Sequence, residues 1–86
     1  MRETESATLA DLRPGESATV RSVGGAGALH RRLLDMGLTP GVMVRMRKTA
    51  PMGDPLEIRL RGYALTLRRE EARRIRVDGR SSGGRA

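Results

Sequence analysis

A β-hairpin is predicted by the stretch LEIRLRGYALTL, residues 56–67. With Arg61-Gly62 as a two-residue turn, the six large apolar side chains of the two strands fall on one face of the hairpin. The facing pairs are then Leu60 and Tyr63, Ile58 and Leu65, and Leu56 and Leu67, with Glu57 opposite Thr66 and Arg59 opposite Ala64 on the other face. A slip of one residue would turn the apolar side chains of one strand to the opposite face. The pattern therefore predicts two paired strands in a single register.

A short helix is predicted over residues 29–36, before the hairpin. One apolar stripe at i, i+4 and i+7 consists of Leu29, Leu33 and Met36. Gly37 follows at the position after the C-cap, where a left-handed backbone favours glycine, and Leu38 can fold back onto Leu33 as in a Schellman motif. We therefore expect the helix to end sharply at Gly37.

Three further short strands are predicted over residues 17–23, 42–48 and 75–77. Apolar and polar residues alternate along the first two, and the same alternation places Ile75 and Val77 on one face of the third. Single helical turns are predicted after Thr8, which can cap the first of them, and over residues 69–73. Five short strands with short connections predict an all-β fold with one short helix, built as a small antiparallel barrel.

The folded part is predicted to be one domain over residues 8–78. Residues 1–7 lack periodicity, and residues 79–86 are rich in Gly, Ser and Arg, so both are expected to be disordered tails. No apolar stretch approaches the roughly 20 residues needed to cross a bilayer, and the N-terminus does not resemble a signal peptide. We therefore expect a cytoplasmic protein that is not itself embedded in a membrane.

The formal net charge of +7 suggests an anionic partner, and a basic barrel that binds RNA or DNA is the alternative hypothesis. The chain has no Trp or Phe and only one Tyr, however, whereas binders of single strands use several aromatic faces for stacking. The composition therefore disfavours nucleic acid, and an acidic protein surface or a membrane surface fits the charge equally well.

Chemistry-bearing residues are sparse. The chain has no Cys, which excludes thiolate metal sites and cysteine nucleophiles, and its single His30 has no carboxylate at ligand spacing. At most a weak, oxygen-rich transition-metal contact is expected. The Gly24–Gly27 segment lacks the Lys-Ser/Thr of a phosphate-binding loop. We predict no catalytic residues, no metal ligands, no cofactor and no small-molecule substrate, so the protein is not expected to be an enzyme.

Three apolar side chains are predicted to face outward. Met43 points away from the core face of its strand, Leu34 lies beside the apolar stripe of the helix, and Met52 lies in a loop. Exposed Met and Leu that converge on one patch are typical of an adaptable protein-binding surface. We predict that they form a partner-binding patch, with Arg31 and Arg45 at its rim.

Several segments, taken in order, resemble the FeoA family. The matching stretches are LRPGE at residues 12–16, RLLDMGLTPG at 32–41, APMGDP at 50–55, Leu67-Arg68-Arg69, Glu71-Ala72, and Ile75 with Val77. The resemblance covers about residues 9–77. It does not include the glycine-rich segment at 24–27.

Membership of this family implies an SH3-like barrel with a helix inserted after the first strand. It also implies a role in bacterial ferrous-iron uptake beside a large membrane permease with a cytoplasmic GTP-binding domain. A similar domain ends some metal-dependent repressors, so the fold alone does not decide the function. We expect an accessory protein that binds the cytoplasmic part of the ferrous-iron permease.

Overall fold

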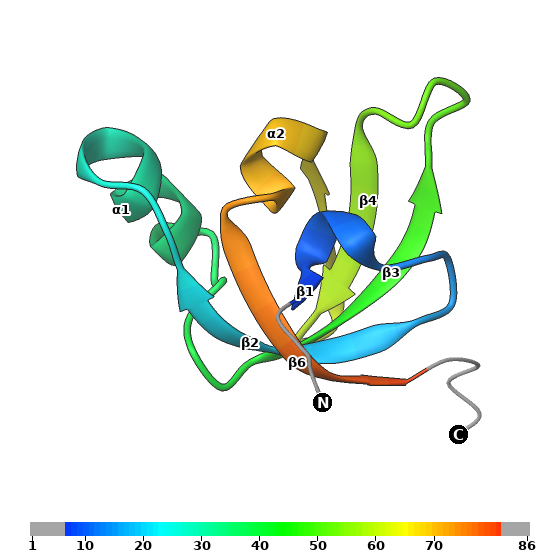
Figure 1. The fold of residues 1–86 in the computed structure, drawn as a ribbon, viewed down its shortest axis with the longest axis horizontal. Coiled ribbons are helices and arrows are strands. Elements are labelled where there is room, and N and C mark those ends of the chain that lie inside the picture. Colours follow the sequence, from blue (N-terminus) through cyan, green and yellow to red (C-terminus); the bar gives the residue numbers. More distant parts are fainter. Residues whose placement is uncertain (1–6, 82–86) are drawn as a thin grey trace.

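The computed structural model describes residues 7–81 as one curved, antiparallel sheet with three short helical segments (Figure 1). The elements are β1 (Ala7–Thr8), the 3-10 helix η1 (Leu9–Asp11), β2 (Ser17–Val23), α1 (Gly27–Asp35), β3 (Met43–Thr49), β4 (Leu56–Leu60), β5 (Tyr63–Leu67), α2 (Arg69–Ala72) and β6 (Ile75–Ser81). The strand order is β1-β6-β2-β3-β4-β5. The predicted all-β, barrel-like fold is confirmed, although the sheet has six strands and stays open.

The β4–β5 hairpin has the predicted register at every position, from Leu56 opposite Leu67 to Leu60 opposite Tyr63. Arg61 and Gly62 form the turn with positive φ angles of 50° and 87°. Two consecutive positive φ angles are typical of a type I′ turn, whose twist matches that of the strands. Local turn chemistry and the apolar alternation therefore select the same pairing.

The predicted end of the helix is also confirmed. The Gly37 N–H donates to the Leu34 carbonyl at 2.9 Å and the Leu38 N–H to the Leu33 carbonyl at 3.2 Å. These are the two bonds of a Schellman motif, and Gly37 has the expected positive φ of 103°. Leu33 and Leu38 are both fully buried. The helix begins at Gly27, two residues before the predicted start.

A side chain from the hairpin holds the same helix end in place. The Tyr63 hydroxyl donates a 2.6 Å hydrogen bond to the carbonyl of Met36, the C-cap residue. A Cβ added at Gly37 would collide with that hydroxyl. Gly37 is therefore required both by its backbone conformation and by the close approach of Tyr63.

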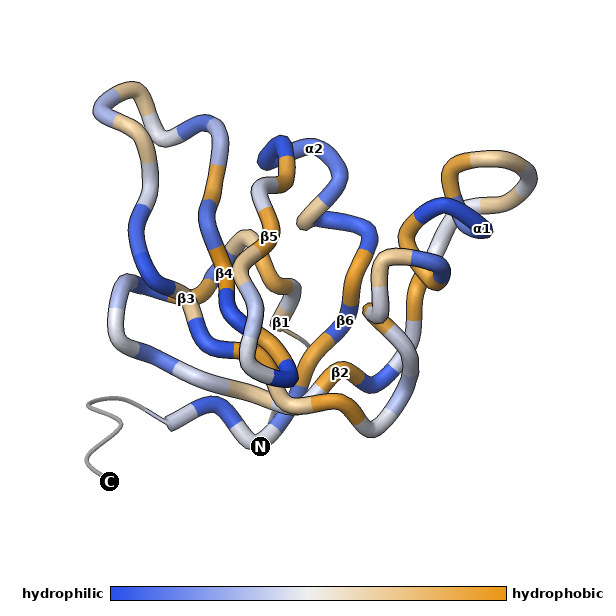
Figure 2. Tube along the Cα trace, turned by 180° about the vertical axis from the view of Figure 1, so that it is seen from behind, coloured by the Kyte–Doolittle hydropathy of each residue, from blue (hydrophilic) through white to orange (hydrophobic). Residues whose placement is uncertain are grey.

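The core fills the concave side of the sheet and contains only apolar side chains among residues 7–81. Figure 2 shows these hydrophobic segments along β2, β4, β5 and β6. The register shifts in the β2–β6 and β3–β4 pairings, where bulges bend a sheet and increase its twist. Leu9 in η1 and Leu12 directly after it are buried and close one end of the core.

Both ends of the fold extend beyond the predicted domain. Ala7, assigned to the first tail by the sequence, pairs with Val77 in β1. The last strand, predicted to end at Val77, continues to Ser81, so residues 79–81 belong to β6 and not to a tail. The rest of the two predicted tails, residues 1–6 and 82–86, lies outside the described residues. Within residues 7–81, no helix has the length and apolarity needed to span a membrane.

Truncation of the helix stripe should destabilise the fold. Leu33→Ala removes a fully buried side chain, and we expect a loss of about 2–5 kcal/mol in the free energy of unfolding through the cavity left behind. Arg31→Ala, on the exposed side of the same helix, should change it by less than about 0.5 kcal/mol. Urea denaturation measures both, and equal losses would contradict the assigned helix face.

Substitution of Gly37 tests the helix end. Gly37→Val forces a β-branched residue to a φ of 103° and towards the Tyr63 hydroxyl. We expect a loss of about 1–3 kcal/mol in thermal denaturation because of backbone strain. Ala64→Val, at an exposed strand position, is the control and should stay within about 0.5 kcal/mol. An unchanged melting temperature for the glycine variant would show that the helix end is misassigned.

Candidate interaction surface

The structure separates the five residues predicted to bind a partner. Met52 is 91% exposed in the β3–β4 loop, and Met43 is 65% exposed at the start of β3. Arg45 is exposed on the same face of β3 as Met43, whereas Arg31 is exposed on α1. Leu34 differs from the prediction, because it is half-buried and packs against the core.

The predicted residues do not converge on one patch. Helix α1 and the β3–β4 loop lie at opposite ends of the molecule (Figure 1), so Leu34 and Arg31 are far from Met52. Strand β3 instead links Met43 at its start to the loop that carries Met52 at its end. Sequence reasoning missed this because it could assign each residue to an element but could not place the elements in space.

Two arginines face each other on the outer side of the sheet. Arg45 of β3 lies opposite Arg59 of β4, and both are exposed. Neither pairs with a carboxylate within the described residues, whereas the neighbouring Arg47 forms a 3.1 Å ion pair with Glu57. Arg45 and Arg59 also line a shallow hollow of about 280 Å³ beside Gly15. Like charges on facing residues are unfavourable, so this position is suited to an anionic partner.

We call this surface the β3 face and define it as Met43, Arg45, Arg59 and, at the loop tip, Met52. It combines two exposed methionines with two cations that have no carboxylate partner in residues 7–81. The arginines lie between the two methionines along β3, and Met and Arg are both enriched at protein interfaces. The alternating sequence predicted Met43 and Arg45, but Arg59 could be added only once the β3–β4 register was known.

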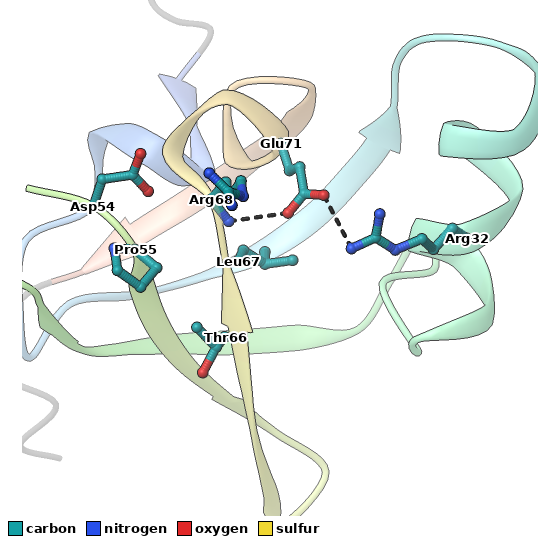
Figure 3. A pocket seen from close by; sticks show the side chains of 7 residues that line it. All are labelled: Arg32, Asp54, Pro55, Thr66, Leu67, Arg68 and Glu71. Atoms are coloured by element: carbon teal, nitrogen blue, oxygen red, sulfur yellow. Dashed lines mark hydrogen bonds and ion pairs between the residues drawn. The ribbon is translucent and has the colours of Figure 1, made fainter.

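A second hollow of about 380 Å³ lies between α1, α2 and the end of β5. Arg32 of α1 and Glu71 of α2 point towards each other across it and form a 3.2 Å ion pair (Figure 3). The other Glu71 oxygen accepts a 3.0 Å hydrogen bond from the Arg68 N–H, which caps α2. Thr66 and Leu67 of β5 also line it. The ion pair joins α1 to the body of the domain at this point.

Arg69 ties three segments together and was not singled out by the sequence. Its Nε donates to the Gly53 carbonyl at 2.9 Å, and its Nη1 donates to the Ala10 carbonyl at 3.0 Å. Its backbone N–H donates to Asp54 Oδ1 at 2.9 Å. This half-buried side chain therefore fixes the β3–β4 loop, which carries Met52, against η1 and α2.

Among residues 7–81, Glu16 is the one group with a clear shift in pKa. The N–H of Arg13 donates to Glu16 Oε1 at 2.8 Å, and this bond, with a smaller effect from the nearby Arg80 guanidinium, lowers the pKa of Glu16. The Arg80 Nε lies 3.2 Å from the same oxygen. Arg80, placed in a tail by the sequence, thus connects the end of β6 to the segment before β2.

His30 is half-buried, and its Nδ1 lies 3.5 Å from the Gly24 carbonyl. Within residues 7–81, no three His, Cys, Asp or Glu side chains are grouped so that they could hold a metal ion.

Comparison with known proteins identifies the family. The model of the FeoA domain matches residues 7–79. The chain belongs to the FeoA family. The match covers β1 to β5 in full and β6 as far as Gly79, and it includes the glycine-rich segment before α1, which the resemblance in sequence had left out.

Solved FeoA structures share the fold. The FeoA of Stenotrophomonas maltophilia, a prokaryotic SH3 domain protein complexed with zinc, is 33% identical with a TM-score of 0.80, over 91% of this chain and 99% of that one. The FeoA of Chlorobium tepidum is 42% identical with a TM-score of 0.77, over 83% of this chain and 68% of that one. The SH3-like character of the domain is thereby confirmed.

A curated relative carries a FeoA segment within a larger protein. The chain is 36% identical over 70 residues to the Fe(2+) transport protein A/Fe(2+) transporter FeoB fusion protein of Porphyromonas gingivalis. The aligned part is 81% of this FeoA-family chain but only 8% of the fusion protein.

Removal of the Arg69 side chain should loosen the β3–β4 loop. Arg69→Ala deprives the Gly53 and Ala10 carbonyls of their donors, and we expect a loss of about 1–3 kcal/mol in the free energy of unfolding. Arg68→Ala, next to it but exposed, should cost less than about 0.5 kcal/mol. Equal effects in chemical denaturation would show that the Arg69 bonds do not stabilise the fold.

Proposed function

We propose that this FeoA-family chain is an accessory, regulatory protein of bacterial ferrous-iron uptake. It acts in the cytoplasm and binds the cytoplasmic part of a GTP-binding ferrous-iron permease. The observation that carries this proposal is the Porphyromonas gingivalis relative, in which an Fe(2+) transport protein A and an FeoB transporter are one polypeptide. The FeoA domain match over residues 7–79 supports the same role.

When two domains are fused in one polypeptide, each has a high effective concentration near the other, so they can associate with a weaker affinity than separate chains need. A chain that works beside a separate permease therefore requires a surface that binds it. The β3 face supplies apolar contact through Met43 and Met52 and charge through Arg45 and Arg59. Charge of this kind mainly speeds encounter and selects an acidic partner, while buried apolar contacts set the affinity.

The role is proposed to be binding and not catalysis. The single His30 lies near a backbone carbonyl, and the carboxylates Glu16, Glu57 and Glu71 accept bonds from arginines or backbone N–H groups that stabilise the fold. These side chains have structural partners. Leu34 and Arg31 stay predicted contacts at the α1 end, in a second area separate from the β3 face.

Charge substitution at the β3 face should weaken binding to the permease. We expect Met43→Asp and Arg45→Glu each to reduce affinity for the cytoplasmic part of the permease by about tenfold or more, since each places a negative charge in a basic, apolar interface. Isothermal titration measures the affinity, and uptake of radioactive Fe²⁺ should fall in cells that carry either variant. The melting temperatures should stay unchanged because both side chains are exposed.

Ser22→Asp, exposed on β2 outside the β3 face, is the matched control and should change neither binding nor uptake. Equal affinity of all three variants would exclude the β3 face as the contact. If the chain instead binds RNA or DNA tightly, with an affinity that falls steeply with salt, the nucleic-acid alternative replaces the proposal.

A further inference from the structure

Within the described residues 7–81, strand β5 ends the sheet and has no strand paired to one side of its backbone. It pairs with β4 and is the last strand in the order β1-β6-β2-β3-β4-β5. In a two-residue hairpin, the residues that flank the turn form a hydrogen-bonded pair, and such pairs then alternate along the strands. Tyr63, Leu65 and Leu67 therefore direct their N–H and C=O groups to β4. Those of Ala64 and Thr66 point away from the sheet.

This edge has none of the features with which proteins usually protect a free strand. Charges, prolines and bulges are the common devices. The segment from Tyr63 to Leu67 contains no charged residue and no proline, and its pairing with β4 has no register shift. The β2–β6 and β3–β4 pairings, in the interior of the sheet, do contain shifts. The edge is thus a regular template for one more strand.

Space exists for an added strand beside Thr66. Its side chain is exposed and lines the hollow of about 380 Å³ that reaches Arg32 and Glu71. In Figure 3 the Thr66 side chain points away from Leu67, towards the other side of the strand. Successive side chains of an added strand alternate between two faces in the same way.

The charges at the ends of β5 indicate what kind of strand fits. Arg61 precedes the strand and Arg68 follows it; both are exposed, and neither guanidinium pairs with a carboxylate within residues 7–81. A second copy of the chain fits poorly, because the antiparallel register that pairs Ala64 with Thr66 of the other copy places the Arg68 of that copy opposite Gly62, next to Arg61, so that cations meet at each end. An extended segment with acidic residues at both ends would instead meet a cation at each end.

We propose that the β5 edge binds an extended, acid-flanked peptide segment of a partner protein by β-strand addition. The outward N–H and C=O groups of Ala64 and Thr66 supply the main-chain hydrogen bonds. Arg61 and Arg68 select acidic ends. This contact lies apart from the β3 face and does not depend on the identity of the protein that contributes the segment.

The test uses two synthetic probes, the acetylated and amidated heptapeptides Glu-Val-Thr-Val-Thr-Val-Glu and Lys-Val-Thr-Val-Thr-Val-Lys, titrated into the ¹⁵N-labelled full chain. The acidic peptide should shift the amide resonances of Ala64 and Thr66 and bind about tenfold more tightly than the basic one. Thr66→Pro removes one edge N–H and should weaken binding by about tenfold, since one main-chain hydrogen bond is lost. The control Thr66→Val keeps that N–H and should bind as the unaltered chain does.

The double variant Arg61→Glu/Arg68→Glu leaves the edge backbone intact and should reverse the preference, so that the basic peptide binds more tightly. It provides the decisive comparison if the proline variant fails to fold. The proposal is overturned if the acidic peptide leaves the Ala64 and Thr66 amides unshifted, or if both peptides bind equally. Concentration-dependent shifts of the same amides without peptide would also overturn it, because a second copy would then occupy the edge.

Discussion

A single sheet that must cover its own apolar face is the constraint on which this fold depends. Within residues 7–81 no second layer of strands packs against it, and the large aromatic residues Phe and Trp are absent from the chain. The sheet therefore curls, with bulges in the β2–β6 and β3–β4 pairings, until Leu, Ile, Val and Met side chains from opposite strands meet. The short helical segments η1 and α2 cover what remains.

This solution leaves the outer face and one edge of the sheet free for contacts. The outer face carries the Arg45–Arg59 pair and Met43, none of which the core requires. Arg69 holds the β3–β4 loop at one end of this face, and the Tyr63 hydroxyl with the Arg32–Glu71 pair attaches α1 at the other end of the molecule. The contacts that fix the β3–β4 loop and helix α1 thus also position the proposed binding surfaces.

The features that could be predicted from the sequence are those set by neighbours in the chain. The hairpin register followed from a two-residue turn and a period of two, and the Schellman motif from Gly37 and Leu38. The start of α1 was placed two residues late, because nothing in the Gly24–Gly27 segment marks a cap.

Features set by distant residues could not be predicted. The continuation of β6 to Ser81 depends on pairing with Ser17, at the far end of the chain. Likewise, Arg69 bonds to Ala10, and Arg59 joins Arg45 only through the β3–β4 register. The expectation of one patch containing Leu34 and Met52 failed for the same reason. The sequence assigned each side chain to its element, but the distance between α1 and the β3–β4 loop depends on the fold of the whole sheet.

Oxidation of the methionines, followed residue by residue with mass spectrometry, tests the proposed contact with the permease most directly. Met43 and Met52 are exposed on the β3 face, whereas Met46 is buried in the core and serves as an internal reference. With the cytoplasmic part of the permease bound, the oxidation rates of Met43 and Met52 should fall while that of Met46 stays the same. Unchanged rates at Met43 and Met52 under saturating permease would contradict the account.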